Sequence, residues 1–143
     1  MFCDVLVTGT FNVLHAGHVE LLEFASQFGE VTVGLNGDRY QVAKYGDLAI
    51  PLQSRASVLR ACRYVANVVH FDEDDPSELV YRLKPNVFVR GPDYAGKDLP
   101  ELEALQDVGA RIIIHHADKL YSGEEVTQIL KATKGFDKWT NSP

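Results

Sequence analysis

Short apolar runs alternate with longer segments of helical spacing along almost the whole chain. The apolar runs lie at residues 4–9, 30–36, 65–71, 85–91 and 110–116. Strands that alternate with helices predict a parallel sheet whose two faces are both covered by helices. We therefore expect an α/β fold of the Rossmann-like, doubly wound type, with about five parallel strands.

Two of the helices are predicted from apolar residues that recur at helical spacing. Residues 16–28 carry the apolar stripe Val19, Leu22 and Ala25. Residues 53–64 carry a stripe that continues into the next strand and consists of Val58, Ala61, Cys62 and Val65. Each stripe is expected to face the sheet, because an amphipathic helix buries its apolar side.

Capping residues and polarity mark the remaining segments. Asp75 can cap a helix whose first position is Pro76. Further helices are expected at 100–108 and from Ser122 onward. Residues 37–51 are polar and contain glycine, so we expect a loop there, or a short helix followed by a loop.

The length and composition indicate one ordinary globular domain. The chain has 143 residues, of which 45% are hydrophobic and 24% are charged. We expect a single domain at 1–134 and a polar C-terminal tail at 135–143. The net charge of −6 argues against a broad nucleic-acid footprint, because such surfaces are basic.

The chain shows neither metal-type cysteine spacing nor a membrane signal. Cys3 and Cys62 are expected to be small buried residues of a protein in a reducing compartment. No apolar run approaches the roughly 20 residues that a membrane-spanning helix needs. The first residues lack a basic region followed by an apolar stretch, so we expect no signal peptide and a cytoplasmic location.

The doubly wound fold predicts where a ligand binds. In such sheets, ligands bind beyond the carboxyl ends of the strands, at the point where the strand order reverses. Four segments are therefore candidates: Gly9–His18, Asn36–Lys44, Arg90–Lys97 and Tyr121–Glu125. The first three directly follow strands, and the fourth lies several residues after one.

The stretch GTFNVLHAGH at residues 9–18 predicts a site for phosphates. His15 and His18 stand three residues apart, so they share one face of the helix that they open. Free N–H groups and the helix dipole favour an anion there, and Gly17 allows close approach to the backbone. Imidazoles can donate hydrogen bonds to phosphate oxygens. The alternatives are two exposed histidines on a capped helix, or a zinc site; no Cys or carboxylate partner follows at ligand spacing, so no metal-ligating side chains are expected.

This stretch resembles the signature G-T-F-D-x-x-H-x-G-H of the cytidylyltransferase-like nucleotidyltransferases. The resemblance covers about residues 4–131, and the family includes glycerol-3-phosphate cytidylyltransferase and the adenylyltransferase that makes ADP-activated heptose. The segment LKPNVFVRGPDYAGKD at 83–98 is most similar to the heptose branch. The resemblance implies that a phosphate oxygen of the substrate attacks the α-phosphate of a nucleoside triphosphate held with Mg²⁺, and that pyrophosphate leaves. Relatives of this family are commonly homodimers.

The resemblance also implies roles for particular residues. The catalytic residues are expected to be His15, His18 and Lys44, which stabilise charge on the phosphates and on the leaving group. Residues of the nucleotide site are expected from the resemblance and from their places after strands. They are Gly9, Thr10, Phe11, Asn12, Gly17, Arg55, Arg90, Gly91, Asp93, Tyr121 and Ser122.

Simpler interpretations stay open for several of these residues. Lys44 could be a solvated loop lysine, and Arg55 a surface residue. Asp93 could be a turn residue, and Ser122 a helix cap. The sequence does not distinguish these interpretations.

The chain departs from the family pattern in three respects that bear on its activity. Asn12 stands where the family usually has Asp, which keeps the shape of the side chain but removes a charge. The segment HADKLYSGEEV, before the last predicted helix, lacks the arginine and the Thr-Thr pair of many cytidylyltransferases. In their place Ser122 and Glu125 form a capping box, and Glu124 and Glu125 would repel phosphate.

Three functions remain open on the sequence alone. The first is a nucleotidyltransferase with a weak preference for ATP and a phosphorylated sugar or alcohol as acceptor. The second is a cytidylyltransferase that acts on glycerol 3-phosphate, a similar phospho-alcohol or a phosphonate. The third is a nucleotide-binding module without turnover.

Overall fold

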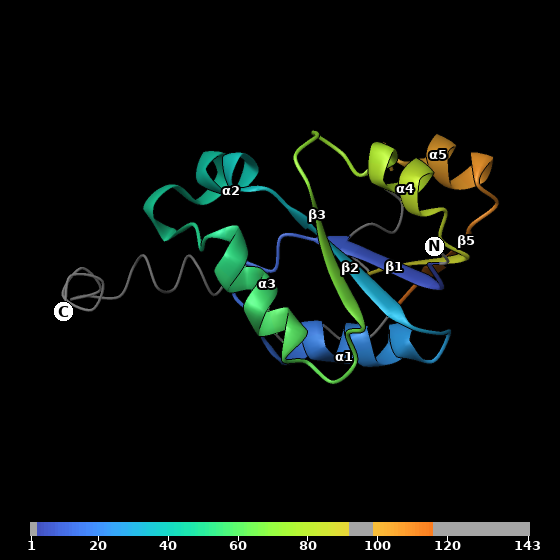
Figure 1. Ribbon diagram of the computed structural model, residues 1–143, viewed down its shortest axis with the longest axis horizontal. Helices are drawn as coiled ribbons and strands as arrows, with labels where there is room; N and C mark the ends of the chain where they lie inside the picture. The colour runs from blue at the N-terminus through green and yellow to red at the C-terminus, as the bar shows by residue number, and fades with distance from the viewer. Residues whose placement is uncertain (1–2, 92–98, 116–143) are drawn as a thin grey trace.

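A five-stranded parallel sheet forms the centre of the molecule. The computed structural model describes residues 3–91 and 99–115. The strands are β1 (Val5–Gly9), β2 (Val31–Asn36), β3 (Asn67–Phe71), β4 (Val87–Arg90) and β5 (Arg111–Ile114). They are all parallel and follow the order β3-β2-β1-β4-β5 (Figure 1). The predicted doubly wound α/β fold with five strands is confirmed.

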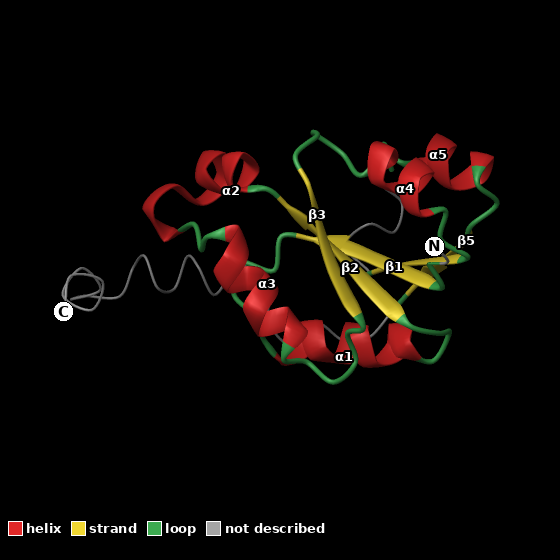
Figure 2. Cartoon of the chain, viewed as in Figure 1, coloured by secondary structure: helices red, strands yellow, loops and turns green. Residues whose placement is uncertain are grey.

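Helices alternate with these strands along the chain (Figure 2). They are α1 (Ala16–Ser26), α2 (Asp38–Tyr45), the short 3-10 helix η1 (Gly46–Leu48), α3 (Leu52–Arg60), α4 (Ser77–Leu83) and α5 (Leu102–Asp107). The predicted short helix followed by a loop corresponds to α2, η1 and the residues after them. Within the described part of the chain, no helix has the length and apolar character needed to cross a membrane. The helix predicted from Ser122 and the boundary between residues 134 and 135 lie outside the described residues.

The two faces of the sheet carry separate hydrophobic clusters. Alternate residues of a strand point to opposite faces, so Val5 and Val7 pack with α1 and α3, whereas Leu6 packs with α4 and α5. Figure 1 shows α1 and α3 along one side of the sheet and α4 and α5 on the other. The predicted burial of Leu22 and Ala25 on α1 is confirmed.

The predicted buried face of the helix at 53–64 is partly wrong. Val58 is 51% exposed, and the buried residues of α3 are Arg55, Ala56 and Leu59. Cys62 and Val65 do pack against the core, but they follow the end of the helix. The predicted stripe consists of small apolar residues. In the structure, α3 instead buries a charged residue, Arg55, because hydrogen-bond acceptors lie within reach of its side chain.

Strand pairing is incomplete where the strand order reverses. The pairing of β1 with β2 continues to Gly9 and Leu35, and that of β4 with β5 continues to Arg90 and Ile114. In contrast, β1 and β4 pair only at Val5–Val87 and Leu6–Phe88. The main-chain ladder between β1 and β4 therefore stops before the carboxyl ends of these two strands, at the position where a doubly wound sheet binds its ligand.

Candidate functional site

The connection from β1 to α1 begins with a strained turn. Phe11 has a φ angle of +47°, in the left-handed region, and its side chain is buried. A Cβ atom on Gly9 would lie 2.9 Å from the Phe11 ring, so glycine makes room for the ring at the end of β1. A left-handed conformation of a residue other than glycine costs on the order of 1 kcal/mol and is concentrated at functional sites.

Two histidines cap the N-terminus of α1 reciprocally. His15 is the N-cap residue, and its Nδ1 accepts a hydrogen bond from the Gly17 backbone N–H at 3.1 Å. The Nδ1 of His18 accepts a hydrogen bond from the His15 backbone N–H at 3.3 Å. The rings stack with their centres 3.9 Å apart, and the Phe11 ring lies 4.9 Å from that of His18. The arrangement is a capping box in which imidazoles replace the usual Ser and Glu.

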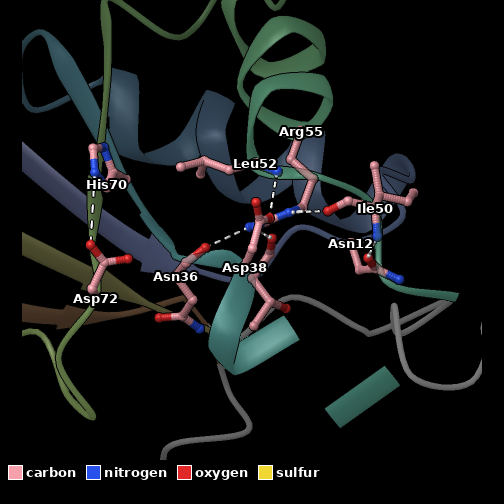
Figure 3. Close-up of polar contacts among 9 residues, drawn as sticks. Asn12, Asn36, Asp38, Ile50, Leu52, Arg55, His70 and Asp72 are labelled. Atoms are coloured by element: carbon pink, nitrogen blue, oxygen red, sulfur yellow. Dashed lines mark hydrogen bonds and ion pairs between the residues drawn. The ribbon is translucent and has the colours of Figure 1, made fainter. Parts of the chain in front are cut away.

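Arg55 is buried at the base of this turn and donates hydrogen bonds to several segments (Figure 3). Its Nη1 donates to the carbonyl oxygens of Thr10 at 3.1 Å and Asn36 at 2.8 Å. Its Nε donates to the carbonyl oxygen of Ile50 at 2.7 Å, and its Nη2 lies 3.3 Å from Oδ1 of Asp38. Burial lowers the pKa of the guanidinium, and the hydrogen bond to Asp38 opposes this shift. Arg55 thus joins the ends of β1 and β2 to the segment before α3.

Asn12 holds the same segment from the other side. Its side chain is buried, and its Oδ1 accepts a hydrogen bond from the Ile50 backbone N–H at 2.9 Å. Since Arg55 donates to the carbonyl oxygen of Ile50, both polar groups of that residue are bonded to side chains. An aspartate at position 12 would offer the same acceptor oxygen, so the family departure at Asn12 preserves this contact.

Arg90 lies across the incomplete pairing between β1 and β4. Its Nη1 donates to Oγ1 of Thr8 at 2.8 Å and lies 3.2 Å from Oε1 of Glu101. All three side chains are buried. The sequence did not single out Thr8 or Glu101 as partners of Arg90. Thr8 lies inside the first predicted strand, and an acidic residue at the start of a predicted helix, such as Glu101, is usually explained by the helix dipole.

The structure brings some of the predicted site residues together and places others apart. Gly9, Thr10, Phe11, Asn12 and Gly17 form the β1–α1 connection with the two histidines, and Arg55 contacts this connection through Thr10. Lys44 lies in the last turn of α2, where its side chain is exposed and its Nζ is 5.3 Å from the centre of the Tyr45 ring. Gly91 follows Arg90 at the end of β4. Asp93, Tyr121, Ser122, Glu124 and Glu125 lie outside the described residues.

The described residues of the site offer several hydrogen-bond donors. Across residues 3–91 and 99–115, no three His, Cys, Asp or Glu side chains are grouped so that they could hold a metal ion. The imidazoles and the backbone N–H groups at the start of α1 suit phosphate oxygens.

A doubly wound parallel sheet, with His-x-Gly-His at the start of its first helix, defines the class of the nucleotidyltransferase domains. Residues 6–135 match the cytidylyltransferase-like family, and the chain belongs to this family. The resemblance seen in the signature at residues 9–18 is thereby confirmed.

Named relatives of the chain are longer proteins. It is 37% identical over 138 residues to the bifunctional protein HldE of Campylobacter curvus, which covers 94% of this chain and 28% of that protein. It is 42% identical over 113 residues to the bifunctional protein HldE of Streptomyces coelicolor, which covers 77% of this chain and 24% of that protein. The chain therefore spans about a quarter of the length of these relatives.

A solved structure shows the same fold. The lipopolysaccharide core biosynthesis protein of Thermoplasma volcanium superposes with a TM-score of 0.67 at 21% sequence identity, covering 83% of this chain and 100% of that chain. At this level of identity, the similarity concerns the fold alone.

Proposed function

We propose that this chain transfers the nucleoside monophosphate of a nucleoside triphosphate to a phosphorylated sugar or alcohol. A phosphate oxygen of the acceptor attacks the α-phosphorus, the bond from the α-phosphorus to the oxygen that bridges to the β-phosphate breaks, and pyrophosphate leaves. The products are an NDP-linked sugar or alcohol and pyrophosphate. Little covalent chemistry is required of the protein, so positioning and stabilisation of charge carry the catalysis.

The observation that carries this proposal is the histidine pair at the start of α1. Two stacked imidazoles and the backbone N–H groups of the first turn lie at the start of the helix that follows β1, and β1 is the strand whose pairing with β4 is incomplete. This combination supplies hydrogen-bond donors and the positive end of a helix dipole at one point. Both favour the charge that develops on the phosphates as pyrophosphate departs.

The other residues have supporting roles in this proposal. Lys44 binds the triphosphate from the exposed side of α2, and Thr10 and Phe11 shape the nucleotide pocket. Arg55 donates to four acceptors within the protein. We therefore assign it to positioning the pocket rather than to direct contact with the phosphates. Mg²⁺, when bound to the triphosphate, would neutralise part of its charge.

ATP and a sugar phosphate are the favoured substrates. Two observations support this choice: the similarity of the segment at 83–98 to the heptose branch, and the similarity of the chain to two HldE proteins. The missing arginine before the last predicted helix argues against CTP. A homodimer and a cytoplasmic location are proposals that rest on the family alone.

Pyrophosphate release tests the proposal directly. The protein is incubated with Mg²⁺ and each of ATP, CTP, GTP and UTP, in combination with sugar phosphates, glycerol 3-phosphate and a phosphonate. Turnover with ATP and a sugar phosphate is expected. Turnover only with CTP and a phospho-alcohol or phosphonate would establish the cytidylyltransferase instead, and nucleotide binding without turnover for any pair would establish a binding module.

Two variants assign the catalytic roles in the same assay. His18→Ala should lower kcat by a factor on the order of 10²–10³, since it removes one preorganised donor. Its effect on triphosphate binding should be much smaller. Lys44→Ala should raise the KM for the triphosphate. An unchanged KM would mean that Lys44 is a solvated surface residue without a role in binding.

A further inference from the structure

Gln41 is a buried polar side chain that the proposed mechanism does not use. It lies in α2 and is fully buried. Neither its Oε1 nor its Nε2 has a hydrogen-bond partner among the described residues. An amide side chain offers an acceptor oxygen and a donor NH2 group, and leaving both unpaired away from water is costly. Because buried polar atoms in native proteins are nearly always paired, this amide is suited to bind a group from outside the chain.

The face of α2 that carries Gln41 is turned toward the candidate site. Asp38, Gln41 and Tyr45 follow one another at helical spacing, so they share one face of the helix. Oδ1 of Asp38 lies 3.3 Å from Nη2 of Arg55, as Figure 3 shows. Arg55 in turn donates to the carbonyl oxygen of Thr10, in the connection from β1 to α1. Gln41 therefore lies one helical turn along from a residue that Arg55 links to this connection.

The second turn of α2 is held by few side chains. The buried residues of the helix are Gln41 and Tyr45, and its other side chains are exposed. Gly46, directly after the helix, has a φ angle of +58°, and a Cβ atom there would meet nothing within 4 Å. The backbone can therefore pivot at Gly46 without a clash. An outward movement of this turn, which has few buried apolar contacts, gives a ligand access to the amide of Gln41.

The chemistry of the amide selects the kind of group that can satisfy it. A fully ionised phosphate offers only acceptors and would leave the amide oxygen unpaired, whereas a cation would leave the NH2 group unpaired. A hydroxyl group both donates and accepts. Two neighbouring hydroxyl groups, as on a sugar, can therefore pair with both ends of the amide at once.

We propose that Gln41 is a specificity-determining residue that binds hydroxyl groups of the phosphorylated acceptor. The second turn of α2 moves outward to admit the acceptor, and the amide then accepts from one hydroxyl and donates to the next. The choice of a sugar phosphate as ligand rests on the proposed function, in which Lys44 of the same helix binds the triphosphate that the acceptor attacks. The amide thereby favours an acceptor with neighbouring hydroxyl groups over a phosphate ester that has none.

Ligand binding without turnover tests this contact. Calorimetry gives the Kd of hexose and heptose 1-phosphates and that of methyl phosphate, which has no hydroxyl on its carbon. Gln41→Met keeps the length of the side chain and removes the amide, and Gln53→Met makes the same exchange at an exposed position on α3. We expect Gln41→Met to weaken sugar phosphate binding by a factor of about 10 or more, and methyl phosphate binding by about twofold or less. Gln53→Met should change neither.

Three results of this titration would overturn the inference. The first is that no sugar phosphate binds the parent chain. The second is that Gln41→Met leaves sugar phosphate binding unchanged or weakens methyl phosphate binding equally. The third is a loss of affinity for ATP alone, which would assign the amide to the nucleotide.

Thermal unfolding of the free protein provides a second test. Since the amide of Gln41 has no partner among the described residues, its replacement by an apolar side chain should leave the Tm unchanged or raise it. Gln53→Met should leave the Tm unchanged. A clear fall of the Tm in Gln41→Met alone would mean that the amide is already satisfied inside the free protein, and would contradict the inference.

The outcomes distinguish this inference from the proposed function. If sugar phosphate binding depends on Gln41 but no substrate pair releases pyrophosphate, the binding role stands and the proposed reaction fails. If a substrate pair releases pyrophosphate and acceptor binding is the same in the parent chain and in Gln41→Met, the reaction stands and the role of Gln41 fails.

Discussion

Two buried arginines lie on either side of β1, and the protein holds them in different ways. Arg55 donates through three nitrogens, mainly to main-chain carbonyl oxygens, and its carboxylate partner Asp38 has a side chain that is 59% exposed. Arg90 donates from Nη1 to Oγ1 of Thr8, and the same nitrogen lies 3.2 Å from Oε1 of Glu101, whose side chain is only 2% exposed.

The difference indicates that Arg55 connects separate segments of the chain, whereas Arg90 is part of a buried ion pair. Arg55 needs the fork of the guanidinium, because its acceptors lie in different segments and different directions. Arg90 needs a compensating charge, because both charges are out of contact with water. A lysine substitution should therefore be harmful at the first position and tolerated at the second, whereas removal of a carboxylate should matter more at the second.

The largest effect is expected from Glu101→Leu. This change leaves the Arg90 guanidinium buried without its carboxylate, and breaking a buried pair by removing one partner typically costs about 3–5 kcal/mol. Urea unfolding measures the change in free energy of unfolding. Glu103→Leu, at an exposed position on the same helix, is the control and should change stability little.

The double variant Arg90→Met/Glu101→Leu sharpens this test. With both charges replaced by apolar side chains, most of the stability should return. A double variant as unstable as Glu101→Leu alone would mean that packing, rather than charge, dominates at this pair.

The second largest effect is expected from Arg55→Lys. A lysine has a single nitrogen and cannot reach the carbonyl oxygens of Thr10, Asn36 and Ile50 together, and an unsatisfied buried acceptor costs about 1–3 kcal/mol. The free energy of unfolding should fall by about 2 kcal/mol or more. Arg60→Lys, at an exposed position on the same helix, should stay within about 0.5 kcal/mol of the parent chain.

A smaller effect is expected from Arg90→Lys. The contacts of Arg90 with Thr8 and Glu101 come from a single nitrogen, Nη1, so a lysine Nζ can take over these two contacts. The same urea measurement should give a loss of about 1 kcal/mol or less. A loss as large as that of Arg55→Lys would remove the distinction between the two arginines.

The smallest effect concerns an exposed hydrogen bond to a carboxylate. Tyr81 on α4 donates from its hydroxyl to Oδ2 of Asp107 on α5 at 2.6 Å, and this bond raises the pKa of Tyr81 to about 12. Because the folded pKa lies above the ordinary value of about 10, the contribution to stability is complete below pH 10 and is lost as the pH rises toward 12. The difference in phenolate absorbance between the parent chain and Tyr81→Phe measures this titration. Asp107→Asn should move it back toward pH 10.

The sequence predicts the fold class of the protein but not the roles of its buried charged residues. Alternation of strands and helices determines the doubly wound fold, because βαβ units have few allowed topologies. The start of α1 was predicted at residue 16, where the structure places it, because the turn and the histidines mark it locally. The inward face of α3 was misassigned, since Val58 fits an apolar stripe as well as Leu59 does.

The partners of a buried charge are set by distant segments, which explains this limit. Arg55 contacts Thr10, 45 positions away in the chain, and Arg90 contacts Thr8, 82 positions away. No local pattern around either arginine carries that information. The sequence therefore identified both arginines as residues of the nucleotide site but did not show which groups inside the protein they contact.

The contacts of Ile50 have a consequence for the dynamics of the segment between η1 and α3. This residue belongs to no helix or strand, yet its N–H donates to Asn12 and its C=O accepts from Arg55. Its amide hydrogen should therefore exchange with deuterium as slowly as one inside the sheet, although segments of this kind usually exchange quickly. This amide can exchange only when the loop after β1 and the segment before α3 separate. The exchange rate of this one amide therefore reports how often these two segments come apart.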